Sequence, residues 1–160
     1  MGGHGRQKNV VLSHLVDPDT RLHDARKKFI VSKFKNTPEC VQDVRKVLDN
    51  DDVDVISIAT PNHWHSLMSI WACQAGKDVY VEKPLSHNLF EGQKLVEAAK
   101  KYKCIVQHGT QNRSLSKWSN LASEIASGKK GKLVVALGTC HKRRKSIGFK
   151  DTQKPPSALD

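Results

Sequence analysis

The chain has 160 residues, enough for one domain of ordinary size, and 38% of them are hydrophobic. No apolar run approaches the roughly 20 residues that would span a bilayer. The N-terminus also lacks the apolar core of a signal peptide. These features argue against a membrane-spanning chain and against export, so we expect a soluble, cytoplasmic protein with no membrane partner.

Positive charge is concentrated toward the C-terminus. The formal net charge is +11, and residues 115–160 contain ten Lys or Arg against three acids. The cluster Lys142-Arg143-Arg144-Lys145 could bind nucleic acid or another anion. It has no interleaved aromatic residues for base stacking and matches no helix-turn-helix or zinc-finger pattern. We therefore interpret it as a solvated loop and regard nucleic acid as an unfavoured partner.

The four cysteines, Cys40, Cys73, Cys104 and Cys140, are far apart in the sequence. None belongs to a C-x-x-C motif, and each lies in or beside an apolar segment. Buried thiols are therefore a better interpretation than a metal site or disulfides.

Hydrophobic periodicity and turn signals predict strands that alternate with helices along the chain. The expected elements, in chain order, are a strand at 10–16, helices at 20–29 and 37–48, a strand at 53–59, a helix at 62–75, a strand at 79–81, a helix at 88–101, a strand at 105–108, a helix at 116–127 and a strand at 133–138. Residues 30–36 are expected to form a basic loop. Alternating strands and helices require crossover connections and predict an α/β fold with a parallel sheet.

Several residues indicate where these helices begin and end. Thr37 can cap a helix whose first position is Pro38. Gly76 can supply the left-handed residue that ends the helix at 62–75. Asn88, with Glu91 three residues later, resembles a capping box.

Polar residues directly follow two of the predicted strands. Thr60-Pro61-Asn62 follows the apolar strand at 53–59, and Glu82-Lys83-Pro84 follows the strand at 79–81. In an open α/β sheet, ligands bind beyond the carboxyl ends of the strands. We therefore expect these two motifs to border one ligand crevice.

Together these residues resemble a known family. Thr60-Pro61-Asn62 with His65, the block Gly76-Lys77-Asp78-Val79, and Glu82-Lys83-Pro84 are similar to the Gfo/Idh/MocA oxidoreductases, relatives of glucose-fructose oxidoreductase and inositol dehydrogenase. The resemblance is close over residues 53–113 and looser over 10–17. It implies an NAD(P)-dependent dehydrogenase with an N-terminal Rossmann domain and a C-terminal domain on a large open sheet. Hydride would pass between the nicotinamide and a sugar or cyclitol hydroxyl, in a chain that can form a homo-oligomer.

The resemblance assigns the catalytic role to Lys83. A partly desolvated lysine at a strand end can position the reacting alcohol and stabilise its oxygen as a proton leaves. The family's lysine contacts both the nicotinamide ribose and the substrate. Glu82 is expected to orient that lysine or the cofactor amide, and a cis bond before Pro84 is possible.

The resemblance also implies a set of cofactor contacts. Asp17 is expected to accept hydrogen bonds from the ribose hydroxyls and to repel a 2′-phosphate, which favours NAD over NADP, although it could simply form a turn. Helix capping is the alternative for the turn that contains His65, and a plain surface role is the alternative for Arg113. The complete expected set is Gly2, Gly5, Asp17, Thr60, Pro61, Asn62, His65, Glu82, Lys83, Gln107, Asn112 and Arg113, with no metal ligand.

The N-terminus departs from the family pattern. Gly2 and Gly5 fit the last two glycines of G-x-G-x-x-G, but too few residues follow for the usual phosphate-binding helix. We therefore expect residues 1–128 to form a dinucleotide-binding domain without its first strand–helix unit. The strands on either side of the missing first strand would then pair directly with each other or leave two open sheet edges.

The C-terminus departs from the pattern as well. Residues 129–160 are expected to begin the substrate domain, which in the family carries a catalytic aspartate and histidine. Nothing after Lys132 provides such a pair, so the chain is expected to be a truncated and weakly active or inactive member. The alternatives are a non-catalytic nucleotide-binding remnant or interaction module, and, least favoured, a basic nucleic-acid binder.

Overall fold

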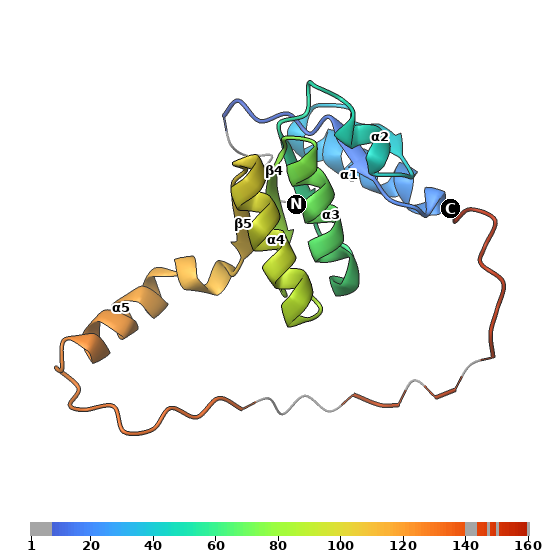
Figure 1. The fold of residues 1–160 in the computed structure, drawn as a ribbon. Helices are drawn as coiled ribbons and strands as arrows, with labels where there is room; N and C mark the ends of the chain where they lie inside the picture. Colours follow the sequence, from blue (N-terminus) through green and yellow to red (C-terminus); the bar gives the residue numbers. More distant parts are fainter. Residues whose placement is uncertain (1–7, 140–143, 147, 150, 160) are drawn as a thin grey trace. The chain divides into compact units, whose positions relative to one another are not determined.

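The computed structural model describes residues 8–139, 144–146, 148–149 and 151–159 (Figure 1). The strands are β1 (His14–Val16), β2 (Glu39–Val41), β3 (Val55–Ile58), β4 (Asp78–Glu82) and β5 (Val106–Gly109). The helices are η2 (Thr20–Leu22), α1 (His23–Phe34), α2 (Arg45–Leu48), η3 (Asn62–Trp64), α3 (His65–Gln74), α4 (Leu89–Tyr102), η4 (Gln111–Ser114) and α5 (Ser116–Ala126). One compact unit runs to Gly109 and includes the segment from Pro155, and a second spans Thr110–Lys154.

All strand pairs in the first unit are parallel, but they form two sheets. β1 pairs with β2, and β4 lies between β3 and β5. The predicted α/β fold with parallel strands is thus confirmed. Among the described residues no strand joins β1 to β3, and these two strands do not pair with each other. Of the two arrangements expected without a first strand, the structure therefore has the one with two open sheet edges.

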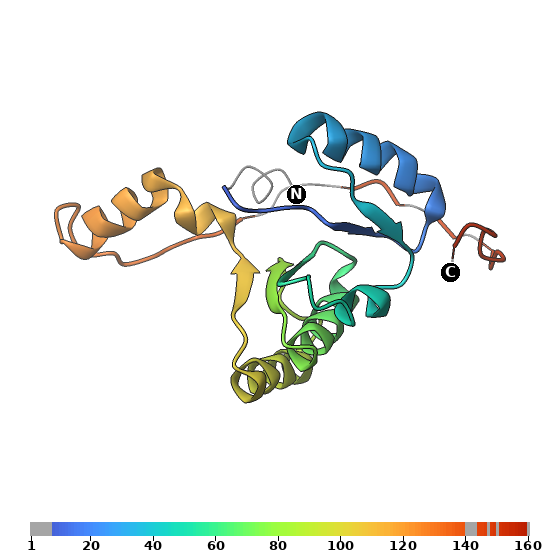
Figure 2. The same cartoon turned by 90° about the horizontal axis from the view of Figure 1, so that it is seen from above.

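Two helices cover one face of the β3–β4–β5 sheet. Helices α3 and α4 lie side by side (Figure 1), and Ile56, Ile58, Val79 and Val81 are at most 8% exposed. The main hydrophobic cluster consists of Val44, Val47, Leu48, Val53, Ile56, Ile58, Ala72, Cys73, Val79, Val81, Leu95 and Ala98. Helix α1 lies alongside β1 and β2 (Figure 2). The alternating burial of β3 and β4 leaves their other face more open to solvent.

The block Gly76-Lys77-Asp78-Val79 connects α3 to β4. Gly76 has a φ of +73°, the predicted left-handed end of the helix. Lys77 is 7% exposed and donates from Nζ to the carbonyl oxygen of Asn50 at 2.8 Å. The Asp78 carboxylate accepts the N–H of Ile105 at 2.8 Å. These contacts connect the segments at the N-terminal ends of β3, β4 and β5. The block therefore has a structural role at the edge of the sheet opposite the carboxyl ends of the strands.

Helix α1 is longer than predicted. The expected helix at 20–29 and basic loop at 30–36 are wrong at their junction, because residues 30–34 continue the helix. Ile30 is 3% exposed, so its burial favours helix where the charged neighbours suggested a loop. The helix ends at Lys35, a left-handed residue whose N–H donates to the Val31 carbonyl at 3.0 Å.

The predicted helix at 37–48 is also largely wrong. Residues 39–41 form β2, Pro38 lies just before it, and only 45–48 are α-helical. The N–H of Glu39 donates to the carbonyl oxygen of Ser13 at 2.8 Å, and the N–H of Asp17 donates to the carbonyl oxygen of Val41 at 3.1 Å. Pairing with β1 therefore satisfies this backbone, a non-local effect that helical spacing cannot reveal.

The remaining predicted strands and helices agree with the structure to different degrees. The strands at 53–59, 79–81 and 105–108 and the helices at 62–75, 88–101 and 116–127 are confirmed to within three residues at each end, counting η3 as the start of the third helix. The strand at 10–16 shortens to β1. The predicted strand at 133–138 is absent from the described residues there, and its Val134 and Leu137 are 83% and 86% exposed. Within the described ranges, no helix combines the length and hydrophobicity needed to cross a membrane.

Candidate functional site

The carboxyl ends of three strands lie at one edge of the main sheet. Register pairs Ile58 of β3 with Val81 of β4, and Glu82 of β4 with Gly109 of β5. Thr60 and Lys83 each follow two residues after a member of the first pair. The two predicted motifs therefore lie side by side, as expected for parallel strands.

The turn after β3 leads directly into a helix. Pro61 precedes η3, which begins at Asn62 and continues into α3, and no side chain caps the start of η3. Pro61 and Asn62 are exposed, whereas Thr60 is partly buried. The Thr60 hydroxyl oxygen is itself buried without a hydrogen-bond partner in the described structure. Uncapped N–H groups and a hydroxyl without a partner are groups that a phosphate or ribose can use.

The loop after β4 carries the predicted catalytic lysine. Glu82 ends the strand, and the peptide bond between Lys83 and Pro84 is cis. The Glu82 carboxylate accepts the N–H of Lys83 at 3.2 Å. The Lys83 side chain is exposed, so the partial desolvation expected for it is not found in this structure. An exposed ammonium at this position remains accessible to a ligand.

His65 joins these two loops. Its ring is 2% exposed, with Nε2 2.9 Å from the Thr60 carbonyl oxygen and Nδ1 2.5 Å from the Pro84 carbonyl oxygen. The sequence placed His65 among the cofactor-binding residues, and the structure directs both ring nitrogens to the protein's own backbone. His63, two residues earlier, is exposed, so the two histidines of this segment lie in different environments.

Asp17 follows β1 and forms a local turn. Its carboxylate accepts the N–H of Asp19 at 2.9 Å, and its carbonyl oxygen lies 2.8 Å from the ring of His23. This is the turn role that the sequence left open for Asp17. A contact with ribose hydroxyls stays a prediction, because a carboxylate can accept several hydrogen bonds at once.

The end of β5 approaches β4 closely. A Cβ on the buried Gly109 would lie 3.1 Å from the Val81 carbonyl oxygen and 3.3 Å from the Glu82 Cα, so a side chain there would push against the end of β4, directly before Lys83. Gln107 is exposed and donates from its side-chain amide to the His108 carbonyl at 2.8 Å. The tight pairing at Gly109 helps to fix the position at which β4 ends.

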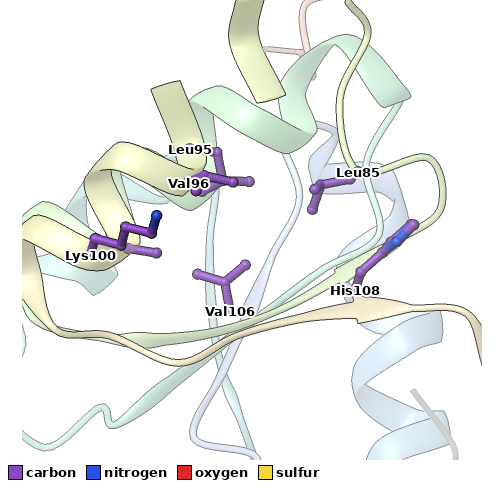
Figure 3. Close-up of a pocket in the computed structure, with 7 residues that line it drawn as sticks. Leu85, Leu95, Val96, Lys100, Val106 and His108 are labelled. Atoms are coloured by element: carbon purple, nitrogen blue, oxygen red, sulfur yellow. The ribbon is translucent and has the colours of Figure 1, made fainter. Parts of the chain in front are cut away.

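A cavity that the sequence did not predict lies between α4 and β5. Its volume is about 270 Å³, and its lining residues are Leu85, Leu95, Val96, Ala99, Lys100, Val106 and His108 (Figure 3). The His108 Nε2 is buried without a hydrogen-bond partner among the described atoms. The only sequence signal was the alternation of β5, which turns Val106 and His108 to one face and Gln107 to the other.

Four predicted cofactor residues cannot be placed at this edge. Asn112 and Arg113 belong to η4 in the second unit, where the Arg113 N–H donates to the Thr110 carbonyl at 3.0 Å. Gly2 and Gly5 lie outside the described residues. Their cofactor contacts remain predictions. No cluster of three His, Cys, Asp or Glu side chains suited to a metal ion occurs among the residues described.

The parallel strands and their crossover helices define a Rossmann-like α/β unit. Residues 3–110 match the Gfo/Idh/MocA family, described as an oxidoreductase family with an NAD-binding Rossmann fold. Because this match covers more than half of the chain, the protein belongs to that family.

Individual relatives include two proteins named as dehydrogenases. The chain is 39% identical over 67 residues to levoglucosan dehydrogenase of Pseudarthrobacter phenanthrenivorans, which covers 42% of this chain and 16% of that protein. It is 32% identical over 97 residues to scyllo-inositol 2-dehydrogenase (NAD(+)) of Bacillus subtilis. This match covers 61% of this chain and 28% of that protein.

A solved structure shows the same fold. Myo-inositol 2-dehydrogenase from Lactobacillus plantarum superimposes with a TM-score of 0.71 at 21% identity, covering 83% of this chain and 38% of that chain. At this identity the likeness concerns the fold alone. In all three comparisons the chain spans well under two thirds of the relative's length.

Proposed function

We propose that this chain binds NAD at the edge formed by the ends of β3 and β4 and takes part in hydride transfer between the nicotinamide and a sugar or cyclitol hydroxyl. The observation that carries the proposal is the neighbouring placement of Lys83 and Thr60 at that edge, inside the segment that matches the family. The sugar or cyclitol substrate class is supported by the names of two relatives, levoglucosan dehydrogenase and scyllo-inositol 2-dehydrogenase.

The residues at this edge fit a nicotinamide nucleoside. The Thr60 hydroxyl is buried without a partner among the described groups, which suits a ribose hydroxyl or an amide. The uncapped start of η3 at Asn62 suits an oxygen of the same group. The pyrophosphate contacts assigned to Gly2 and Gly5 belong to the same proposal.

Each residue then has a defined task. Bound NAD would supply the group that accepts a hydride, which is one proton with two electrons, from the substrate carbon. The Lys83 ammonium would donate hydrogen bonds to the substrate hydroxyl oxygen and a ribose hydroxyl, stabilising that oxygen as its proton passes to water at this exposed edge. Glu82, whose carboxylate contacts the Lys83 N–H at 3.2 Å, would hold the start of this loop.

The choice of NAD over NADP is assigned to Asp17. A carboxylate after β1 accepts hydrogen bonds from two ribose hydroxyls and repels a 2′-phosphate. NADPH should therefore bind at least about tenfold more weakly than NADH, a difference of about 1.4 kcal/mol. Equal affinities in parallel titrations would remove the NAD preference without affecting the nucleotide site itself.

Isothermal titration of the 160-residue chain with NADH tests the site. We expect a dissociation constant in the micromolar range for the unchanged chain. Lys83→Ala removes a charged hydrogen bond worth about 1.5–3 kcal/mol, so its affinity should fall roughly 10- to 100-fold. Folding should persist, because Lys83 is exposed.

Lys101→Ala is the matched control. Lys101 is an exposed lysine in the last turn of α4, at the edge of the sheet opposite Lys83, and its loss changes the net charge equally. NADH affinity should stay within about twofold. Zero heat with the unchanged chain at millimolar NADH would reject nucleotide binding and leave the interaction module as the better function. An equal loss in both variants would assign the effect to net charge.

A further inference from the structure

His65 is the most buried titratable side chain at the proposed cofactor edge. The residue begins α3, and its ring is 2% exposed. Its Nε2 lies 2.9 Å from the carbonyl oxygen of Thr60, and its Nδ1 lies 2.5 Å from that of Pro84. Thr60 follows β3 and Pro84 follows β4, so one ring spans the gap between two adjacent strand ends.

Both partners of the ring can only accept hydrogen bonds. A backbone carbonyl carries no hydrogen, and a neutral imidazole has a single N–H. If the ring were neutral, one of the two short contacts would oppose two lone pairs. Both contacts are favourable only when each ring nitrogen carries a hydrogen. Charged N–H groups also make the shorter and stronger bonds, which offsets part of the cost of burial.

Neighbouring residues of α3 strengthen the same connection. The Ser66 hydroxyl donates at 3.3 Å to the carbonyl oxygen of Leu85, the residue that follows Pro84. The Ser69 hydroxyl donates to the carbonyl of His65 at 2.7 Å. Ser66 and Ser69 are both fully buried. The first turn of α3 therefore holds the loop that contains Lys83 from its C-terminal side.

We propose that His65 is a positioning residue with a doubly protonated ring, which sets the spacing between Thr60-Pro61-Asn62 and Glu82-Lys83-Pro84. The ring acts through the backbone, because both of its nitrogens are used by the protein. Removing either bond would let the two loops separate and would shift the backbone of the loop that contains Lys83 relative to the turn at Thr60. The consequence for NADH rests on the proposed function, whereas the state of the ring does not.

The ring state is measured directly in the unliganded chain. Long-range ¹H–¹⁵N NMR spectra of the histidine rings, with the His65 signals assigned by their loss in a variant, should place both nitrogens in the range of protonated imidazole. One nitrogen in the range of an unprotonated ring would overturn the two-bond arrangement. This outcome is independent of any cofactor.

Two variants that each keep one donor test the positioning role. His65→Asn retains a donor near the Nδ1 position, toward Pro84, and His65→Gln retains one near the Nε2 position, toward Thr60. Each should shift the amide signals of Lys83 and Leu85 and weaken NADH binding about tenfold. His63→Asn, at the exposed neighbour two residues earlier, should change neither. Wild-type amide shifts in both variants would overturn the proposal.

The readouts separate this inference from the proposed function. If the unchanged chain fails to bind NADH but shows the doubly protonated ring and the shifted Lys83 amide in the variants, the proposed function fails and the positioning role stands. If NADH binds and both variants bind it equally well, the positioning role fails alone. If both variants fail to fold, the ring spectrum of the unchanged chain decides.

Discussion

Cys73 illustrates how burial changes the chemistry of a single side chain. The residue lies near the end of α3 and is fully buried. Burial, together with the neighbouring Cys104 thiol, raises the pKa of Cys73 to about 11 from its ordinary 9.0. Cys104 and Cys40 are partly exposed, and all three are free thiols, while Cys140 lies outside the described residues. The predicted buried thiol is thus confirmed for Cys73.

We predict that Cys73 resists alkylation in the folded protein. At pH 8 iodoacetamide should modify Cys40 and Cys104 first, because the thiolate is the reactive form and Cys73 is both protonated and covered. The raised pKa favours the folded state fully below about pH 9 and loses this effect as the pH rises toward 11. Peptide mass spectrometry over time measures the rates, and urea should equalise them. Equal rates in the folded protein would contradict the prediction.

Helix α4 shows how local contacts define a complete element. The Asn88 side chain accepts the N–H of Glu91 at 3.0 Å and donates to the Glu91 carboxylate at 2.7 Å. At the other end Lys103 is left-handed, and its N–H bonds to the Ala99 carbonyl. Leu95, at 1% exposure, anchors the middle of the helix in the core. Caps and burial therefore act together on one segment.

We predict that Asn88→Ala lowers the free energy of unfolding by about 1 kcal/mol, the usual cost of losing an N-cap. Urea unfolding, followed by circular dichroism, measures the change as a lower midpoint with an unchanged slope. Gln93→Ala, an exposed substitution in the same helix, serves as the control and should stay within about 0.5 kcal/mol. An equal effect of both substitutions would show that the cap contributes nothing specific.

At the scale of the whole first unit, stability is unevenly distributed. The main hydrophobic cluster draws on β3, β4, α2, α3 and α4, on Val44 just before α2 and on Val53 just before β3. The β1–β2 pair has only three residues in each strand, and its buried Leu15 stands outside that cluster, as does Ile30 of α1. Since no described strand bridges β1 and β3, the two sheets share no backbone ladder. We therefore expect them to differ in local stability.

Hydrogen exchange should reveal this difference. Amides of β4, which pair on both sides, should exchange at least about tenfold more slowly than amides of β1 and β2, since short two-stranded pairs are marginally stable. Exchange measured by NMR or by mass spectrometry of peptides gives the comparison. Exchange rates that coincide in both sheets would indicate one cooperative unit and contradict the expectation.

Much of the fold, and the shared edge of the two strand-end motifs, could be predicted from local sequence. Short apolar segments bounded by turn signals predicted β3, β4 and β5, and Gly76 and Asn88 marked helix ends that the structure confirms. The motifs at Thr60 and Lys83 were predicted to share one edge, and parallel pairing places them there. These features depend on side-chain periodicity and on groups a few residues apart, which the sequence displays directly.

Other features were decided only by tertiary contacts. Residues 39–41 are a strand because β1 offers a ladder, and residues 30–34 are helical because Ile30 has a core to enter. The two carbonyl partners of His65 come from loops that are 24 residues apart in the chain, and the His108 cavity needs α4 above β5. Hydrogen-bond partners and burial arise between segments distant in sequence, so Thr60, His65 and Lys83 were visible in the sequence, whereas the two carbonyl partners of the His65 ring were not.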